Sequence, residues 1–527
     1  MKLGSLTDLP NLPVTDLSVT DLAINPPRLP AIVGQTPWSA RDAIVPQPQL
    51  KHQPHRRCQQ PDQGVGRGPG GPPHKHHSLV FFLALIPFAA QGAEFRVSSY
   101  GAKGDGKTVD TVALQKAIDA AAKAPNGTIV FNPGVYLTGS LFLKSGTHLR
   151  LDEGVEIHGV QDQAAYPVMQ TRVAGIEMKW PAALINVYEQ DGVEISGKGS
   201  IDGDGKFWWD AYRALRAEYE PKGLRWAADY DSERPRLIQI YKSSNVNLSG
   251  LTLKRSGFWT VHICYSQKVN VNGITIRNNI GGMGPSTDGI DVDSSADVLV
   301  EHCDIECNDD AIVLKAGRDS DGLRVNRPTE RVVIRDNTVR GGAAGVTVGS
   351  ETSGGIHDVE AYRLHVLGRV SNGILFKSAS TRGGTVENIN IHDVDIQGTS
   401  AAISVTLNWN PSFSYAKLPE GITLTSMPDY WRVLLTPVPA EKGMPHVRHI
   451  RIAGVKASGA QRAFSVSSYA DSPLQDFTFQ DLDIEAAMAG AIQNAEDWKF
   501  TRTSVRATDG SHVVVKDSRG VTGLEGQ

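Results

Sequence analysis

The sequence has few cysteines, few aromatic residues, little charge imbalance and no long hydrophobic run. Four cysteines in 527 residues exclude a scaffold built from disulfide bonds. A formal net charge of −4 provides no basic field for nucleic acid, and no apolar run is as long as a bilayer-spanning helix. The chain is rich in glycine, with 53 residues, and 40% of it is hydrophobic. We therefore predict a turn-rich globular protein with a large core and with neither nucleic acid nor membrane as partner.

The first part of the chain does not have the composition of a folded domain. Thirteen of the 29 prolines lie within residues 1–74, so we predict that this segment is disordered or is an upstream extension added by a mistaken gene start. Basic residues, the apolar run 79–90 and small residues follow, which is typical of a secretory signal peptide at 75–93. A short buried helix is the alternative. Because a signal peptide should begin the chain, we expect translation to start near Val65, which N-terminal sequencing would test.

An eight-residue pattern recurs through the remainder, with apolar residues at positions one, three, six and usually eight. Its copies begin at Val246, Val269, Val298, Val332, Val359, Ile389, Ile450 and Phe477, and all the intervals except that from Ile389 to Ile450 are of similar length. Two short alternating strands joined by a two-residue corner explain each copy. A period in the high twenties is typical of one coil of a parallel β-helix, and a β-propeller or sandwich is the alternative.

We therefore predict an all-β fold, a single-stranded right-handed parallel β-helix spanning residues 94–520. The long interval from Ile389 to Ile450 represents either two coils or one coil with the irregular insertion 407–444. One helical stretch near 112–123 is expected to cover the N-terminal end and protect its exposed strand edge.

Acidic residues fall at related offsets in successive coils. Asp309 and Asp310 stand at offsets 11 and 12 from Val298, whereas Asp288 stands at offset 19 from Val269. Glu351 and Lys377 stand at offsets 19 and 18 from the starts of the next two copies. Because coils stack, we expect these side chains to gather, and neighbouring carboxylates raise one another's pKa, so that one can act as an acid and another as a base. That pair is what glycoside hydrolysis requires; the alternative is an Asp-Asp turn without chemistry.

Several motifs together resemble glycoside hydrolase family 28, the polygalacturonases, whose fold is the pectin-lyase-like β-helix. They are Ser286-Thr287-Asp288-Gly289-Ile290-Asp291, Asn308-Asp309-Asp310-Ala311-Ile312, Val348-Gly349-Ser350-Glu351, Gly373-Ile374-Leu375-Phe376-Lys377, Tyr100-Gly101-Ala102-Lys103-Gly104-Asp105-Gly106 and Ile201-Asp202-Gly203-Asp204-Gly205. The likeness extends over about residues 97–460.

This resemblance implies an inverting, single-displacement hydrolysis of α-linked galacturonic acid. Asp309 would protonate the leaving oxygen, and Asp288 and Asp310 would hold and deprotonate the attacking water. Lys377 would bind a sugar carboxylate, and Glu351 is a further candidate for substrate binding. The resemblance implies no metal and no cofactor, unlike the calcium-assisted lyases that share the architecture.

The chain departs from the family pattern at two positions. Ala343 stands where the family usually has histidine, at the same coil offset as Asp309, and Leu375 replaces the arginine of an Arg-x-Lys motif. Loss of that bidentate group would suit a less anionic subsite, such as one holding rhamnose beside galacturonate. His262 is a candidate replacement for the missing histidine; a hydrogen-bonded histidine inside the wall is the alternative.

Other residues are candidates for the rim of the cleft. Arg318 would clamp substrate carboxylates unless it pairs with aspartates in its own loop. Trp409, in a polar Asn-Trp-Asn context, is a candidate sugar-stacking platform. The insertions 207–236 and 407–444 would close one end of the cleft and favour attack from the chain end.

Taken together, the sequence predicts a monomeric, secreted or periplasmic hydrolase that acts on pectic polysaccharide or oligogalacturonides. The alternatives are a rhamnogalacturonan hydrolase or galacturonohydrolase and, from another class, an inactive pectin-binding β-helix protein. Three intact aspartates argue against loss of activity. A lyase is less well supported, because neither a calcium cluster nor a basic arginine is apparent.

Overall fold

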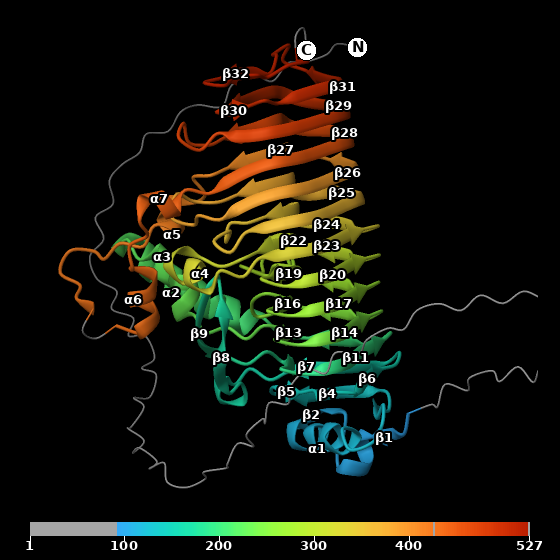
Figure 1. Ribbon diagram of the computed structural model, residues 1–527. Helices are drawn as coiled ribbons and strands as arrows, with labels where there is room; N and C mark the ends of the chain where they lie inside the picture. The colour runs from blue at the N-terminus through green and yellow to red at the C-terminus, as the bar shows by residue number, and fades with distance from the viewer. Residues whose placement is uncertain (1–91, 425–426, 525–527) are drawn as a thin grey trace, which may run out of the picture. The chain divides into compact units, whose positions relative to one another are not determined.

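A computed structural model describes residues 92–424 and 427–524 (Figure 1). The predicted extension 1–74 and the apolar run 79–90 lie outside the described residues. All of the described residues belong to one compact unit. No helix in that part is long and apolar enough to cross a membrane.

The chain forms a right-handed parallel β-helix in which each coil contributes to three parallel sheets. Strands of the first sheet are β1 (Glu94–Arg96), β3 (Thr128–Val130), β6 (His148–Leu151), β11 (Asp191–Gly197), β14 (Ser244–Ser249), β17 (Gln267–Asn272), β20 (Ala296–Glu301), β23 (Thr329–Arg335) and β30 (Ala495–Glu496). Strands of the second sheet are β2 (Asp105–Val109), β4 (Gly134–Thr138), β7 (Val155–Gly159), β12 (Ser200–Asp202), β15 (Thr252–Lys254), β18 (Thr275–Arg277) and β21 (Asp304–Glu306). Strands of the third are β5 (Leu141–Phe142), β10 (Ile185–Tyr188), β13 (Ile238–Tyr241), β16 (Val261–Cys264), β19 (Ile290–Asp293), β22 (Asp310–Lys315), β27 (Ala401–Thr406) and β32 (Val514–Lys516).

Longer strands turn the corners between sheets. They are β24 (Thr338–Val348), β25 (Ile356–Lys377), β26 (Thr385–Gln397), β28 (His446–Ser467), β29 (Leu474–Gln493) and β31 (Lys499–Ala507). The only antiparallel pair of named strands in the described part is the hairpin β8 (Val168–Val173) and β9 (Ile176–Pro181).

The predicted eight-residue repeat matches the pairing of strands in the first sheet, where the first positions of successive copies lie opposite one another. Val246 lies opposite Val269, Val269 opposite Val298, and the pairing continues through the first position of every later copy to Phe477. Ile389 pairs directly with Ile450, so the long interval between them is one coil with an insertion. The propeller and sandwich alternatives are excluded.

Each copy of the repeat turns at a residue in the left-handed backbone region. Position five has a positive φ in all eight copies, at Gly250, Gly273, His302, Asp336, Arg363, Asp393, Gly454 and Asp481. The residue before position one also has a positive φ throughout, at Asn245, Lys268, Asp297, Arg331, Asp358, Asn388, His449 and Asp476. Glycine, asparagine and aspartate tolerate this region best, which explains the polar, glycine-rich corners in the sequence.

A substitution at Gly273 tests this explanation. Its φ is 63° and an added Cβ would meet nothing within 4 Å, so only backbone strain opposes a side chain. We expect Gly273→Ala to lower the free energy of unfolding by about 1 kcal/mol and Gly273→Asn by less, measured by urea denaturation. Equal losses for the two variants would show that the corner conformation does not limit stability.

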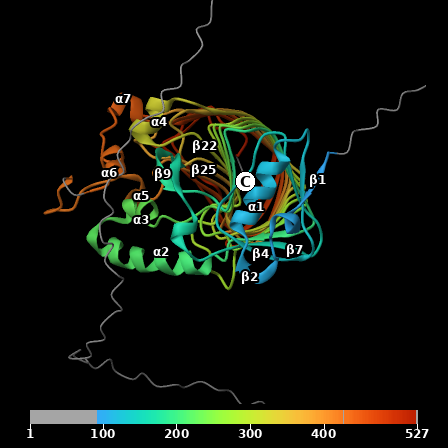
Figure 2. The ribbon, with the colours of Figure 1, turned by 90° about the horizontal axis from the view of Figure 1, so that it is seen from below.

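Helix α1 (Thr111–Ala121) matches the predicted helical stretch. It lies across the N-terminal end of the described coils and packs Leu114, Ala117 and Ile118 towards β1, β3 and β5 (Figures 1 and 2). Apolar positions of the repeat fill the interior of the coil, and they form one continuous hydrophobic cluster from Val97 to Val505.

The remaining helices lie on one side of the coil, together with the β8–β9 hairpin (Figure 2). They are α2 (Lys206–Tyr219), α3 (Arg225–Asp231), α4 (Asp319–Val325), α5 (Pro411–Ser414), α6 (Asp429–Leu434) and α7 (Ala440–Gly443); short 3₁₀ helices occupy Val97–Tyr100, Gln163–Ala165 and Glu220–Lys222. A second hydrophobic cluster, including Trp180, Trp226 and Trp431, joins the hairpin, α3 and α6. The insertions therefore form one packed wall beside the third sheet.

Candidate active site

Three aspartates meet beside the third sheet. Asp288 precedes β19, Asp309 precedes β22, and Asp310 begins β22; one carboxylate oxygen of each lies within 4.8 Å of those of the other two. Asp288 is level with Asp310, since Ile290 pairs with Ile312. The coil offset of Asp288 is larger than that of Asp310 because the loop 278–288 lengthens its coil. The predicted gathering of the carboxylates is present.

The three carboxyl groups differ in exposure and in charge environment. Asp288 and Asp310 are buried, whereas Asp309 is half-buried and reaches the pocket. Burial, and then the neighbouring Asp310, raise the pKa of Asp309. Burial, followed by Asp309 and Asp291, holds the pKa of Asp288 well above its usual range. The group can therefore keep a proton at a pH where an isolated aspartate has lost it.

Lys377 is bound to the aspartate group. Its Nζ donates to Asp310 Oδ2 at 2.6 Å and lies 4.3 Å from the ring centroid of Trp409. Asp310 also accepts a hydrogen bond from Thr347 Oγ1 at 3.0 Å. This ammonium, which the resemblance assigns to a sugar carboxylate, neutralises Asp310 in the structure. Trp409 is half-buried and lines the pocket, where a sugar can reach it.

Lys315 is a second buried ammonium, which the sequence analysis did not single out. Its Nζ lies 3.4 Å from Asp288 Oδ2, 3.5 Å from Asp291 Oδ1 and 3.6 Å from Glu351 Oε2. Burial raises the pKa of Asp291 to about 8, while Lys315 opposes that rise. Burial would raise the pKa of Glu351 too, but Lys315 and other cations bring it below its usual value. The signal available in the sequence was a lysine at the end of the strand that begins with Asp310.

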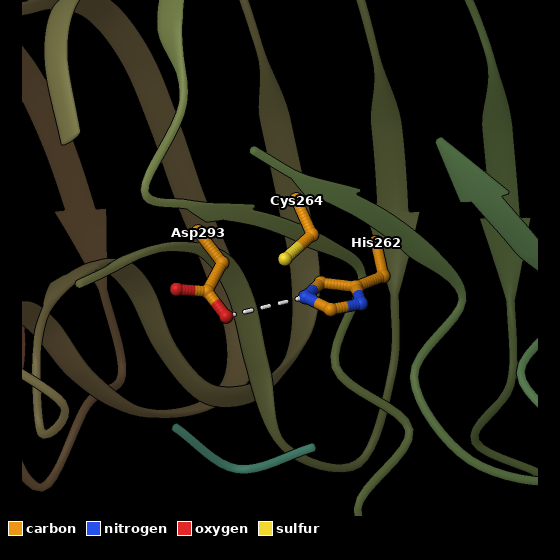
Figure 3. A group of neighbouring side chains, drawn as sticks. All are labelled: His262, Cys264 and Asp293. Atoms are coloured by element: carbon orange, nitrogen blue, oxygen red, sulfur yellow. Dashed lines mark hydrogen bonds and ion pairs between the residues drawn. The ribbon is translucent and has the colours of Figure 1, made fainter. Parts of the chain in front are cut away.

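His262 lies inside the wall and not on the pocket surface (Figure 3). It is fully buried, and its Nε2 is 3.4 Å from Asp293 Oδ2, with Cys264 adjacent. Asp293 also accepts a hydrogen bond from Arg172 Nη1 at 3.0 Å. Burial and the nearby Arg236 cation lower the pKa of His262 to about 4, so the ring is neutral. The expectation that His262 replaces a substrate-binding histidine is therefore wrong. The alternative, a hydrogen-bonded histidine inside the wall of the coil, describes its position.

Ala343 does occupy the position expected of the missing histidine. Its backbone N–H donates to the Asp309 carbonyl at 2.8 Å, so the two residues are neighbours on adjacent coils. Leu375 is buried and is not among the residues that line the pocket.

Arg318 does not reach the rim of the cleft. It is fully buried, donating to Asp319, to the Tyr230 hydroxyl and to the carbonyls of Phe413 and Ser414. The arginine therefore ties the β22–α4 loop to α3 and α5, and the prediction of a substrate clamp is wrong. Sequence alone did not reveal that two distant insertions cover this loop.

Segments from three insertions complete the pocket. Ala174 comes from the β8–β9 turn, Arg225 and Asp229 from α3, and Asn410 and Phe413 from the segment around α5. Glu351 lines the pocket from the side of the coil. Arg225 and Asp229 were missed because nothing in the repeat predicts where an insertion folds back.

Neighbouring carboxyl groups in a pocket are the groups that glycoside hydrolases use for catalysis. The sequence profile described as glycosyl hydrolases family 28 matches residues 133–427, and the chain belongs to this family. A profile described as rhamnogalacturonase A/epimerase, pectate lyase-like, matches residues 95–152.

Related proteins carry polygalacturonase names. A probable polygalacturonase of Vitis vinifera is 31% identical over 323 residues, which are 59% of this chain and 62% of that protein, so the match spans less than two thirds of it. An exo-poly-alpha-D-galacturonosidase of Dickeya chrysanthemi is 26% identical over a match that covers 79% of this chain and 74% of the Dickeya protein. Proteins called endo-polygalacturonases match as well.

Among solved structures, a hyperthermoactive exopolygalacturonase from Thermotoga maritima superposes with a TM-score of 0.63 at 25% identity. The superposition covers 80% of this chain and 91% of that protein.

Proposed function

We propose that the protein is a polygalacturonase that removes galacturonic acid from the ends of pectic polysaccharides or oligogalacturonides. One observation carries the proposal: three carboxyl groups, with oxygens within 4.8 Å of one another, line a pocket together with residues from three insertions. Membership of family 28 and the polygalacturonase relatives support the substrate class.

In this proposal Asp309 protonates the leaving glycosidic oxygen, since it is the most exposed of the three carboxyl groups; its pKa is raised, as is that of Asp288. Asp288 and Asp310 hold the attacking water. Two oxygens within 4.8 Å can share one water, because two hydrogen bonds of about 2.8 Å reach that far. Lys377 donates a hydrogen bond to Asp310 and holds its carboxyl group in place.

Attack from the chain end is supported by the wall of insertions. A long polymer needs an open groove, whereas a pocket bounded by α3, α5 and the β8–β9 turn suits a terminal sugar. The Dickeya and Thermotoga proteins are both named for exo action.

Product sizing on polygalacturonate is the decisive experiment, with rhamnogalacturonan in parallel. We expect monomeric galacturonate from the first turnovers, with little loss of viscosity while reducing ends accumulate. Early oligomers of mixed length would contradict exo action. Cleavage of rhamnogalacturonan alone would favour the second candidate, which the buried Leu375 and the rhamnogalacturonase-type profile over 95–152 support. No release from either substrate would favour a binding protein.

The stereochemistry of hydrolysis is a separate prediction. Inverting carboxyl pairs usually lie about 6.5–9.5 Å apart and retaining pairs about 5 Å apart. Here one oxygen of each carboxyl group lies within 4.8 Å of the others, a distance between single oxygens that both arrangements allow. We expect inversion, because a shared water between Asp288 and Asp310 leaves neither free as nucleophile. Proton NMR during the first turnovers should show the β-anomer, and an α-anomer would contradict the assigned roles.

We further propose that residues 75–93 direct export to the exterior or periplasm and that 94–520 is the mature catalytic domain. N-terminal sequencing of the native protein tests this. A mature chain that begins near Ala93 is expected, and one that retains residues 79–90 would contradict it.

A further inference from the structure

The charged groups that line the pocket leave little positive charge for an anionic substrate. Five carboxyl groups line it, from Asp229, Asp288, Asp309, Asp310 and Glu351, against three cations. Two of these cations are engaged, Lys377 by Asp310 and Lys315 by Asp288, Asp291 and Glu351. A sugar carboxylate entering here meets net negative charge unless a further cation faces it.

The third cation, Arg225, has hydrogen-bond donors that are not used by the described residues. It begins α3, and its Nη1 donates to Asp229 Oδ2 at 2.5 Å, with its Nε 3.7 Å from Glu220 Oε1. Within residues 92–424 and 427–524 its guanidinium makes no other hydrogen bond, so Nη2 is free. The side chain is 16% exposed, and its Cζ lies 5.2 Å from the ring centroid of Phe413. A partly desolvated guanidinium with a free edge is suited to bind a carboxylate.

Two arginines of the insertion that bears Arg225 share one carboxylate. Arg225 and Arg234 share the single carboxylate of Asp229, while Arg216 pairs with Glu220. Three guanidinium groups therefore face two carboxylates. Arg234 is fully buried, so Arg225 alone of the three lines the pocket.

Asp229 connects Arg225 to the catalytic aspartates. Its Oδ1 accepts a hydrogen bond from Ser286 Oγ at 3.2 Å, two residues before Asp288. Arg234 Nη1 holds the same loop through the carbonyl of Pro285 at 2.7 Å. The position of the guanidinium is thus fixed relative to Asp288, whereas Leu375, in place of the family's arginine, is buried away from the pocket.

We propose that Arg225 binds the carboxylate of the galacturonate unit in the pocket, so that an arginine from the α2–α3 insertion replaces the one absent at Leu375. This inference rests on the proposed function and adds a specificity-determining residue to it.

The test compares wild type with Arg225→Gln, using trigalacturonate as substrate and galacturonate or galactose as competitive inhibitor. The two monosaccharides differ in the carboxylate alone. We expect Arg225→Gln to raise KM and the inhibition constant of galacturonate about 10- to 100-fold, with kcat changed less than about threefold and galactose inhibition unchanged. Arg225→Lys should recover part of the affinity, because it restores the charge without the planar fork.

Arg216→Gln is the matched control, since it removes a guanidinium from the same insertion outside the pocket; its KM should equal that of wild type. Unchanged galacturonate affinity in folded Arg225→Gln, or equal weakening for galacturonate and galactose, would overturn the inference. If Arg225→Gln does not fold, the ratio of the inhibition constants of galacturonate and galactose is measured on Arg225→Lys instead. A ratio equal to that of wild type would then overturn the inference. Wild type that releases no galacturonate would overturn the proposed function itself, and the inference with it.

Discussion

Replacing Asp309 with asparagine is expected to lower kcat on oligogalacturonides about 10²- to 10⁴-fold. Asp309 reaches the pocket and its raised pKa keeps a proton available, whereas an amide has none to transfer. Reducing-end release measures the loss. In wild type, kcat should fall as pH rises through the raised pKa of Asp309, because the ionised group cannot protonate the leaving oxygen.

The matched control for this variant is Asp297→Asn. Asp297 lies in the same coil, and asparagine tolerates its φ of 56°; the substitution removes only an exposed ion pair with Arg331. Its kcat should equal that of wild type. Asp309→Asn should unfold at the wild-type temperature, since it leaves the packing intact. Substantial residual turnover would mean that another carboxyl group donates the proton.

The fold was predictable because a β-helix repeats its local structure. Each coil places the same positions against the same neighbours, so one pattern gave the register of eight copies. The eight-residue pattern does not extend to the coil that precedes Val246, and the reason is local. Val193 pairs with Val246, but its corner contains one more residue, so that Ile201 and not the residue before it lies opposite Leu253.

The site was predictable only as far as the repeat extends. Asp309 and Ala343 share an offset and are neighbours, whereas the loop 278–288 shifts Asp288. His262 does alternate outward between Val261 and Ile263, as strand periodicity requires. It is nevertheless buried, because the β8–β9 hairpin covers that face and Arg172 of β8 binds the neighbouring Asp293. How insertions pack depends on contacts between distant segments, which no periodicity encodes.

Lys315→Met is expected to lower kcat about 10- to 100-fold, to move the pH optimum upward and to destabilise the protein. The Lys315 cation lowers the pKa of Asp288 and of Asp309, so without it both carboxyl groups hold their protons to higher pH. Because the two carboxyl groups titrate together, both limbs of the kcat profile move upward.

The loss of stability should depend on pH with a definite sign. Lys315 is the main cause of the lowered pKa of Glu351, which therefore contributes stability above the unfolded pKa, and this contribution is lost as pH falls through the folded pKa. Removing Lys315 removes this contribution and leaves buried carboxylates unpaired. Denaturant unfolding should show a deficit of about 3–5 kcal/mol at pH 7, and a smaller one near pH 4, where the carboxyl groups are protonated.

Lys254→Met is the matched control, because Lys254 Nζ also pairs with a carboxylate, that of Glu156 at 2.7 Å, but is partly exposed and lies outside the pocket. It should lose less than about 1 kcal/mol and keep the wild-type pH profile. Lys315→Arg, which retains the charge, should keep the optimum near that of wild type even if the larger group lowers kcat. Lys315 Nζ also lies 4.6 Å from the ring centroid of Trp259. A Lys315→Met profile with both limbs unshifted would mean that Lys315 supports the site only through this contact, and that the protonation of Asp288 and Asp309 is set by burial and by the other aspartates.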